Sequence, residues 1–287
     1  MGEYHVKKLI ESEDPIYQVW EMLINDIWKP EENIEEYFDR EEEAKRFEKE
    51  LNTIFFEIYR YLYENIHKAS TKYNLPLIIV DGLSIREGNL LVRDLRSEGY
   101  KVTKYSYTFS ALPSTTQSFR NIFNTKYVEI RSGKIPYEIN FNVPIWISYP
   151  DQILHHAGEI IPPHEAYEKT KNLILEVLSK VESDEVTIIS DHGYIMLNYV
   201  WPVAEKDRRF LRSVFGARRF IKNEEVEKGK IKKLMRIPED KNYVFIDENY
   251  CYIKGRYFWP VGGYMSNIIH GGLSLMECIV PLIKIKM

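Results

Sequence analysis

Four short groups of carboxylates, hydroxyls and imidazoles are the residues of this chain best suited to chemistry, and each group follows an expected strand. One is Asp191-His192, which comes directly after the β-branched run 186–190. Such a run is typical of a buried parallel strand, and ligands of open α/β sheets lie beyond the carboxyl ends of strands. A carboxylate beside an imidazole offers two good ligands for a divalent metal. Taken alone, the pair is better explained as a helix N-cap and a turn, so the case depends on the other groups.

Two further groups follow apolar runs of the same kind. Asp81 and a glycine follow the run 75–80, and Asp151 with His155 follows the run 143–149. An aspartate and a histidine four residues apart can bind one metal ion, although a surface turn explains them as well. A lone Asp-Gly after a strand is more often only a turn. The three aspartates together place a carboxylate after each of three expected strands.

A cluster of hydroxyls forms the fourth group. Pro113 and the residues 114–118 (Ser-Thr-Thr-Gln-Ser) predict the start of a helix after an expected strand at 101–110. A hydroxyl there lies at the positive end of the helix dipole, among free backbone N–H groups. That position suits a nucleophile that attacks a phosphoryl group, because the same N–H groups can hold the phosphate oxygens. Taken alone, the cluster is better explained by simple capping by Ser or Thr.

The elements that must position these groups alternate between strand and helix. Amphipathic patterns predict helices over 84–98 and 163–182, and alternating residues over 243–259 suggest a hairpin or two. A final strand is expected at 279–283, and His270 precedes it, although a lone His-Gly-Gly is weak evidence of a site. The alternation predicts an α/β fold whose mostly parallel sheet is flanked by helices.

The first 74 residues follow a different pattern. Apolar residues at helical spacing predict a helix over 15–28 and one long helix over 35–72. No catalytic grouping occurs there. We therefore expect an N-terminal helical segment, residues 1–74, that packs on a domain formed by residues 75–287. A surface for a protein partner is the sharper alternative for these helices.

The composition is that of a globular protein, with 44% hydrophobic and 29% charged residues in a chain of 287, which excludes wholesale disorder. The sequence has no apolar run of membrane-spanning length and no signal-peptide pattern. Its two cysteines, Cys251 and Cys278, fit no disulfide or metal framework. We therefore expect a cytoplasmic protein that does not interact with membranes.

The net charge of −4 hides a strongly basic segment, residues 206–236, which holds 12 basic and 4 acidic side chains. Phe210, Phe215 and Phe220 are interleaved with its arginines. Such a segment can contact phosphates and stack on bases, which predicts nucleic acid or an oligonucleotide as a partner. A charged solvent-exposed surface is an equally good explanation.

Taken together, the motifs resemble the PglZ domain, a family within the alkaline phosphatase superfamily. In order they are Asp-Gly after a strand, Leu-Pro-Ser-Thr-Thr-Gln, Asp-x-x-x-His-x-x-Gly, Ser-Asp-His-Gly and His-Gly-Gly-x-Ser-x-x-Glu followed by a Val-Pro strand. Each motif is short, but five in this order at the expected strand ends are fairly specific. The similarity extends over residues 75–287 and implies an alkaline-phosphatase-like core, while the N-terminal helices stay unexplained.

The resemblance implies a two-metal phosphohydrolase site that usually holds zinc. By motif position, one metal would be bound by Asp81, Thr116, Asp191 and His192, and the other by Asp151, His155 and His270.

The same resemblance selects between neighbouring candidates. Thr116 is the expected nucleophile rather than Thr115, because the family's hydroxyl falls three residues after the proline. His155 is preferred to His156, because the superfamily places a histidine four residues after the aspartate and a glycine three beyond it.

Two arginines are candidates for holding a phosphate oxygen, and the motifs do not decide between them. Arg120 lies one helical turn beyond Thr116, and Arg86 is a rival. In many relatives an arginine follows the first aspartate more closely than Arg86 does, and this departure leaves the phosphate clamp undecided.

Two functions follow from these observations. The first is a zinc-dependent phosphodiesterase or phosphatase that acts on an anionic phosphoester, such as a nucleotide or an oligonucleotide, through a threonine nucleophile. Two metals about 4 Å apart can hold the attacking and leaving oxygens of an in-line displacement, and coordination lowers the pKa of a hydroxyl. The alternative is a non-catalytic PglZ-type interaction module in a phage-defence or regulatory complex. The complete ligand set favours the enzyme, because a module freed from catalysis need not keep all seven groups.

Overall fold

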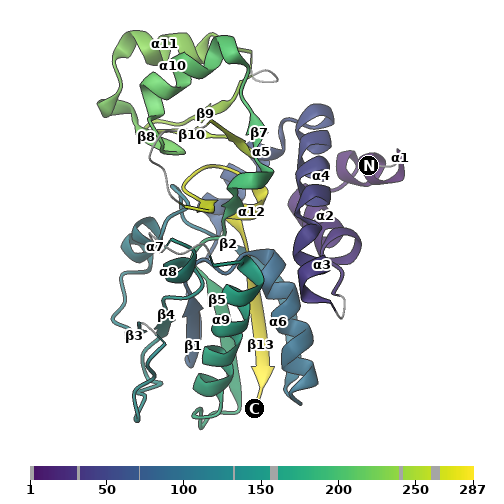
Figure 1. The fold of residues 1–287 in the computed structure, drawn as a ribbon, viewed down its shortest axis with the longest axis vertical. Helices are drawn as coiled ribbons and strands as arrows, with labels where there is room; N and C mark the ends of the chain where they lie inside the picture. Colours follow the sequence, from purple (N-terminus) through teal and green to yellow (C-terminus); the bar gives the residue numbers. More distant parts are fainter. Residues whose placement is uncertain are drawn as a thin grey trace.

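The computed structural model describes residues 3–30, 33–70, 72–131, 133–155, 161–238, 242–259 and 266–287. Its centre is a six-stranded sheet (Figure 1). The strand order is β2 (Lys101–Phe109), β13 (Ile279–Lys286), β5 (Glu185–Ser190), β1 (Leu77–Val80), β4 (Ile145–Ile147) and β3 (Val128–Ile130). β1 pairs parallel with β4 and β5, and β3 pairs parallel with β4, whereas β13 is antiparallel to both of its neighbours. The predicted α/β fold with a mostly parallel sheet is therefore confirmed.

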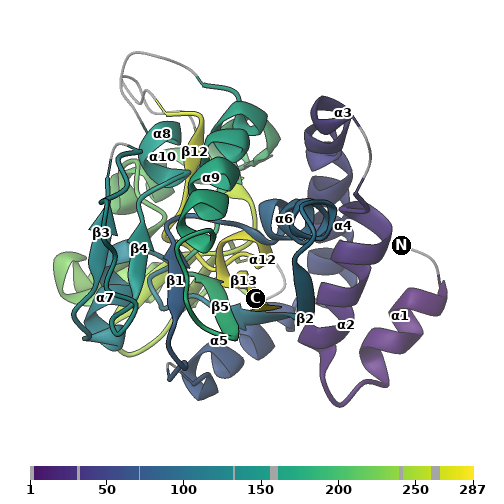
Figure 2. The same cartoon turned by 90° about the horizontal axis from the view of Figure 1, so that it is seen from below.

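Helices cover both faces of this sheet (Figure 2). Ile78 and Val80 of β1 belong to the main core, together with side chains of α6 (Ile85–Ser97) and α9 (Pro163–Leu178). Leu77 and Ile79 point the other way, into a smaller core with Phe119 of α7 (Thr116–Phe123). This burial on both sides explains why the strands are continuous apolar runs rather than alternating ones.

The predicted helix over 84–98 is confirmed, since α6 has Ser84 as its N-cap and Gly99 follows it with φ +88°. The helix predicted over 163–182 is α9, which ends at Leu178. The chain must turn there to enter β5 at Glu185.

The N-terminal residues form separate short helices. They are α1 (Glu3–Ile10), α2 (Pro15–Met22), a π-helical turn η1 (Leu23–Ile27), α3 (Ile34–Asp39), α4 (Glu41–Ile54) and α5 (Ile58–Lys68). The prediction of one long helix over 35–72 is wrong, because a turn at Arg40 separates α3 from α4 and the backbone leaves helical geometry at Phe55. The apolar stripe hides both breaks, since each helix turns its own apolar face to one shared core.

Buried ion pairs tie these helices to the rest of the protein. Glu41 and Glu48 of α4 are fully buried and pair with Arg86 of α6 and with Arg256, which are also fully buried. The Tyr37 hydroxyl donates a hydrogen bond to the carbonyl of Arg86 at 2.8 Å. The helical segment therefore shares its core and its charges with the sheet domain, and a boundary near residue 74 stays a prediction.

A second, smaller unit lies at the top of Figure 1. It contains β7 (Trp201–Pro202), α10 (Glu205–Phe215), β8 (Phe220–Lys222), η3 (Asn223–Glu225), α11 (Lys228–Met235), β9 (Val244–Ile246), β10 (Tyr250–Ile253) and β11 (Tyr257–Phe258). β9 and β10 pair antiparallel, which confirms a hairpin within 243–259. We call residues 203–238 and 242–259 the basic subdomain. Phe215 is fully buried in its core, so this ring cannot stack on a base as the sequence suggested.

The remaining elements are short: α8 (Asp151–Leu154), β6 (Ile195–Met196), η2 (Leu197–Tyr199), β12 (Ile268–Ile269) and α12 (Leu275–Cys278). Among the described residues, no helix combines the length and the apolar character that a membrane span needs. Both cysteines are buried free thiols.

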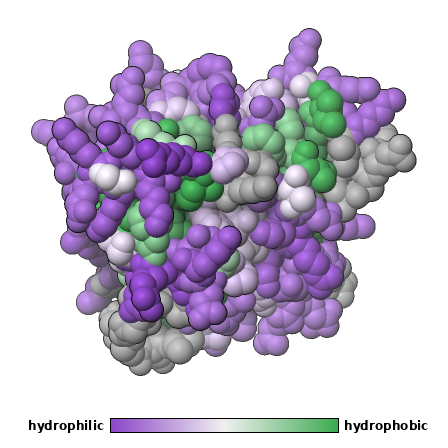
Figure 3. Space-filling model, turned by 90° about the horizontal axis from the view of Figure 1, so that it is seen from above, coloured by the Kyte–Doolittle hydropathy of each residue, from purple (hydrophilic) through white to green (hydrophobic). Residues whose placement is uncertain are grey.

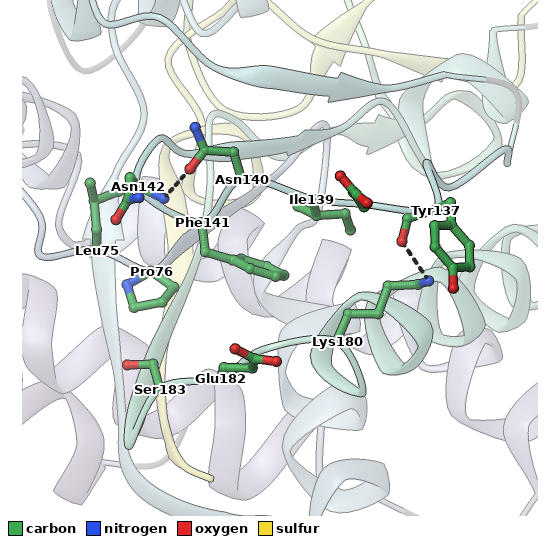
Figure 4. A pocket seen from close by; sticks show the side chains of 11 residues that line it. Leu75, Pro76, Tyr137, Ile139, Asn140, Phe141, Asn142, Lys180, Glu182 and Ser183 are labelled. Atoms are coloured by element: carbon green, nitrogen blue, oxygen red, sulfur yellow. Dashed lines mark hydrogen bonds between the residues drawn. The ribbon is translucent and has the colours of Figure 1, made fainter.

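A cavity of about 690 Å³ opens at the amino ends of the strands, between the segments that enter β1, β4 and β5 (Figure 4). Lys180 reaches across its rim and donates a hydrogen bond to the carbonyl of Tyr137 at 3.4 Å. None of the candidate site residues lines this cavity, so the chemistry must be sought at the other end of the sheet.

Candidate metal centre

The sheet topology brings the candidate residues to one edge. β1, β4 and β5 are adjacent and parallel, so Asp81, Asp151 and Asp191 all follow the same ends of their strands. β13 is antiparallel to β5 and therefore begins where the others end. The segment before β13 consequently brings His270 to the same edge.

One group of ligand atoms consists of Asp81, Asp191 and His192, whose ligand atoms all lie within 4.8 Å of one another. All three residues are buried. The Thr116 hydroxyl adjoins this group, because its Oγ1 donates to Asp81 Oδ1 at 3.1 Å and lies 3.1 Å from His192 Nε2. The structure thus brings together the four residues expected around one metal.

A second group consists of Asp151, His192 and His270, again within 4.8 Å of one another. His155 adjoins it, with its Nε2 3.3 Å from Asp151 Oδ1 and its ring 5.2 Å from that of His270. His192 was expected to serve only the first metal, but its position lets it reach both groups. His156, the alternative to His155, and the glycine of the same motif, Gly158, lie outside the described residues.

All three histidines are oriented through Nδ1. His192 Nδ1 lies 3.0 Å from the carbonyl of Gly193, and His270 Nδ1 lies 3.1 Å from the carbonyl of Ser114. Because a carbonyl only accepts, each of these Nδ1 atoms must carry the proton, which leaves the Nε2 lone pair free to bind a cation. His155 Nδ1 meets the Ser266 hydroxyl at 3.2 Å. Metal-binding histidines usually have such a partner on the second ring nitrogen.

Several ligand atoms make no hydrogen bond. Within the described part of the chain, Asp151 Oδ1, Asp191 Oδ2 and His155 Nε2 are buried without a hydrogen bond of good geometry, although Asp151 Oδ1 and His155 Nε2 lie 3.3 Å apart. Buried polar atoms are rarely left unsatisfied, and such exceptions point to an ion or another missing partner. All three atoms belong to the candidate ligand set, so the residues present fit a divalent cation. Imidazole and carboxylate ligands suit zinc and also manganese or iron.

The electrostatics of the apoprotein agree with this fit. Burial raises the pKa of Asp81 well above its usual range, and the neighbouring Asp191 and Asp151 raise it further. Burial likewise raises the pKa of Asp191 to about 7. Carboxylates crowded into a dry site resist ionisation unless a cation compensates them.

The second group behaves differently because histidines surround its carboxylate. Burial alone would raise the pKa of Asp151, but the contact with His155 and the nearby His270 and His192 lower it. Burial lowers the pKa of His270 to about 3, and His192 adds to this effect. His270 is therefore neutral near pH 7 and has a lone pair available for a metal.

Thr115 and Thr116 have different roles in the structure. Thr115 is the N-cap of α7, and its Oγ1 accepts a hydrogen bond from the Ser118 amide at 3.2 Å. Thr116 begins the helix and turns its hydroxyl to Asp81 and His192. The two explanations of the hydroxyl cluster therefore both hold, one for each residue.

The two candidate arginines for a phosphate contact, Arg86 and Arg120, also differ. Arg86 is fully buried and paired with Glu41 and Glu87, so it cannot hold a substrate phosphate. Arg120 lies near the site, with its guanidinium 4.6 Å from the ring centroid of Trp146, but its Nη2 is bonded to Glu129 at 3.0 Å.

Three residues near the site had no assigned role in the sequence. Trp146 donates a hydrogen bond from Nε1 to Asp81 Oδ2 at 3.2 Å. Because it lies within an apolar strand, the sequence does not indicate that it contacts a ligand residue. Ser114 lay in the hydroxyl cluster and orients His270 through its carbonyl. Glu277 lay in the last motif, and its carboxylate accepts from the Gly272 amide at 2.8 Å.

Comparisons with known proteins agree with the motifs. Residues 152–285 match the family model described as the BREX system PglZ alkaline phosphatase-like domain. A Bacillus cereus (strain H3081.97) protein named alkaline phosphatase-like protein PglZ is 28% identical over 178 residues, which cover 59% of this chain. The chain spans only 19% of the length of that relative.

The family match begins one residue after Asp151, so Asp81 and Thr116 lie outside it. The sheet and its flanking helices nevertheless form one alkaline-phosphatase-like α/β fold that contains both parts. The resemblance drawn from the motifs is thus confirmed, since residues 152–285 match the PglZ alkaline phosphatase-like model and the chain is similar to a protein of that name.

Proposed function

We propose that this protein is a two-metal phosphohydrolase, a zinc-dependent phosphodiesterase or phosphatase that acts on nucleotides or oligonucleotides. The observation that carries the proposal is the arrangement of the three histidines. Each is held through Nδ1, and their Nε2 atoms lie among Asp81, Asp151 and Asp191. Bound divalent ions would supply Lewis-acid stabilisation of phosphate oxygens and would lower the pKa of a coordinated hydroxyl.

The role we assign to Thr116 is that of the nucleophile. Its Oγ1 lies 3.1 Å from Asp81 Oδ1 and 3.1 Å from His192 Nε2, so it adjoins two of the ligand atoms of one group. A cation held there would lower the pKa of the hydroxyl, and its proton would pass to water, which would leave an oxygen able to attack phosphorus. Thr116 also begins α7, so a phosphate at Oγ1 would lie at the positive end of that helix.

Arg120 is our candidate for an electrostatic contact with the substrate. It would have to exchange its bond to Glu129 for a phosphate oxygen, or act from where it lies on the Trp146 ring. Its Nε has no hydrogen-bond partner within the described residues, so one donor is free for a ligand.

The basic subdomain supports an anionic polymer as substrate. Its exposed basic side chains are Lys206, Arg209, Arg212, Arg218, Lys222, Lys228, Lys232, Lys233 and Arg236. Figure 3 looks down on this end of the molecule and shows a largely hydrophilic face with smaller hydrophobic patches. Phe220 is half-buried and packs beside Gly271, which is next to His270. Positive side chains on this subdomain would attract a nucleic-acid backbone.

The test compares a single-stranded oligonucleotide with a small chromogenic phosphodiester as substrates. Lys232→Glu combined with Arg236→Glu should raise KM for the oligonucleotide about tenfold, because two phosphate contacts are lost, and should leave hydrolysis of the small diester unchanged. The matched control is Lys101→Glu with Lys286→Glu, which reverses two exposed charges at the far end of the sheet. Equal effects of the two double variants would argue against the basic subdomain as the substrate surface. A wild type that hydrolyses neither substrate in the presence of divalent metal would contradict the proposed activity itself.

The N-terminal helices are a second proposed surface, for a protein partner. α3 and α4 expose acidic side chains, namely Glu35, Glu36, Asp39, Glu43 and Glu50. This face suits a partner with a basic surface. The description of the matched family names the BREX system. A role in phage defence and a location in the cytoplasm are proposals for this chain.

A further inference from the structure

Glu277 lies outside the ligand set but contacts both segments that carry the central histidines. It is fully buried at α12, just before β13. Its backbone carbonyl accepts a hydrogen bond from the Gly193 amide at 2.9 Å, and its carboxylate Oε1 accepts one from the Gly272 amide at 2.8 Å. Gly193 follows His192 directly, and Gly272 follows His270 by two residues.

From these contacts, two short chains of hydrogen bonds lead to the imidazoles. On one side, the Gly193 carbonyl accepts the Nδ1 proton of His192. On the other side, the Ser114 hydroxyl donates to the Gly272 carbonyl at 2.8 Å, and the Ser114 carbonyl accepts the Nδ1 proton of His270. Glu277 therefore adjoins the peptide groups that set the orientation of both rings.

Arg219 of the basic subdomain completes this arrangement. It is fully buried, and its Nε and Nη2 donate to the two carboxylate oxygens of Glu277, each at 2.9 Å. Its Nη1 donates to the carbonyl of Tyr257 at 2.6 Å. Arg219 is therefore the basic residue of the segment 206–236 that joins the subdomain to the loop behind His270, rather than a surface charge.

The packing leaves no room for a looser arrangement. A side chain at Gly272 would place its Cβ 2.7 Å from Arg219 Nε, and one at Gly193 would place it 2.1 Å from the carbonyl oxygen of Met276. Both glycines are thus needed because the ion pair and α12 lie directly against the backbone of the two histidine segments.

We propose that Glu277 is a positioning residue of the metal centre, which holds the His192 and His270 segments in register, and that Arg219 locks the basic subdomain to it. The role in catalysis rests on the proposed function, whereas the positioning does not. Outer partners that orient metal-binding histidines commonly affect metal affinity about 10–100-fold.

The competing explanation is that Glu277 only stabilises α12. Ser274 caps this short helix, because its Oγ accepts a hydrogen bond from the Glu277 amide at 3.2 Å. The same hydroxyl donates a hydrogen bond to Glu277 Oε2 at 2.5 Å. A residue with this role alone would affect global stability without a specific effect on the two histidine segments.

The experiment uses the full chain with Glu277→Gln, and the double variant Arg219→Met with Glu277→Gln. The double variant leaves no unpaired buried charge and so retains the better chance of folding. Asp94→Asn is the matched control, because Asp94 is a buried carboxylate that accepts from Tyr167 at 2.7 Å between α6 and α9. Hydrogen exchange of the metal-free protein and binding of Co²⁺ are measured for each.

We expect amides in 270–275 to exchange at least about tenfold faster in both Glu277 variants, because the carboxylate that accepts from the Gly272 amide is replaced, while β1 is unchanged, and Co²⁺ affinity to fall about 10–100-fold. The Gly193 amide is bonded to the backbone carbonyl of Glu277, which both variants keep, so amides in 190–196 should change less. Asp94→Asn should change neither exchange nor affinity. Exchange that rises equally in β1 and in 270–275, or that stays at the wild-type level, would overturn the positioning role. A wild type that binds no Co²⁺ would instead contradict the proposed metal centre, and the exchange data would still test the positioning.

Discussion

The imidazole rings of His192 and His270 stack with their centroids 4.2 Å apart and their planes 22° from parallel. Each ring donates its Nδ1 proton to a backbone carbonyl, and the Nε2 atoms of both rings face carboxylates. Two imidazoles this close would repel each other if both were protonated, and burial lowers the pKa of His270 to about 3. The His270 ring therefore has its Nε2 lone pair available for a cation near pH 7.

Replacement of Thr116 tests the nucleophile. Thr116→Ala should lower kcat by at least about 10³-fold, because removal of a nucleophile leaves only binding and electrostatic effects. Thr116→Ser keeps the hydroxyl and should retain measurable turnover. Thr115→Ala is the matched control, since loss of its cap should cost about 1 kcal/mol of stability with little effect on kcat. Hydrolysis of a chromogenic phosphodiester checks all three, and full activity of Thr116→Ala would exclude the proposed nucleophile.

Metal stoichiometry tests the two ligand groups. His192 lies in both groups, so His192→Ala should lose both ions. Asp81→Ala and His270→Ala should each lose mainly one ion, because each residue lies in a single group. Elemental analysis of the purified variants gives the ratio of metal to protein. If His192→Ala kept both ions, His192 would not be the shared ligand.

The pH dependence of stability tests the state of Asp191 in the metal-free protein. Burial raises its pKa to about 7, above the ordinary value of about 3.9 that an unfolded aspartate has. A raised pKa means that this carboxyl stabilises the fold when it is protonated, and that the contribution is lost as the pH rises from about 4 through about 7. The stability of the wild type relative to Asp191→Asn should therefore fall over that window.

Chemical unfolding in the presence of a chelator, at pH 5 and at pH 8, measures this difference. The comparison with Asp191→Asn measures the effect of this carboxyl, including its contribution to the raised pKa of Asp81. A wild type that gained stability relative to the variant between these pH values would contradict the raised pKa. Added divalent metal should remove the loss, because a cation stabilises the ionised form.

The buried ion pairs predict that the N-terminal helices are needed for folding. Glu41→Ala would leave Arg86 and Arg256 with one fewer carboxylate in a site closed to water, which should cost about 3–5 kcal/mol. Glu43→Ala on the same helix removes an exposed carboxylate and should change stability by less than about 0.5 kcal/mol. Urea unfolding of both variants measures the contrast. Equal stabilities would mean that the helical segment is only loosely attached.

The sequence predicted the parts of the site that depend on strand ends. Asp81, Asp151 and Asp191 follow apolar runs, and adjacent parallel strands necessarily bring their carboxyl ends together. Thr116 was predicted by the family motif, while the helix start alone did not distinguish it from Thr115. These predictions needed only local pattern and general topology.

Other features depend on contacts that leave no local trace. The partners of His192 and His270 are backbone carbonyls, which every residue has, so no residue type reports them. The break at Phe55 has no proline or glycine to mark it. Arg86 and Arg219 look like surface charges in the sequence, but both are buried by segments distant in the chain.

Elemental analysis of the purified wild type, combined with activity after chelation and metal re-addition, tests the metal centre most directly. We predict two divalent ions per chain, loss of phosphodiester hydrolysis with the chelator, and recovery when metal returns. A protein without bound metal that hydrolyses the substrate equally well before and after chelation would contradict the account.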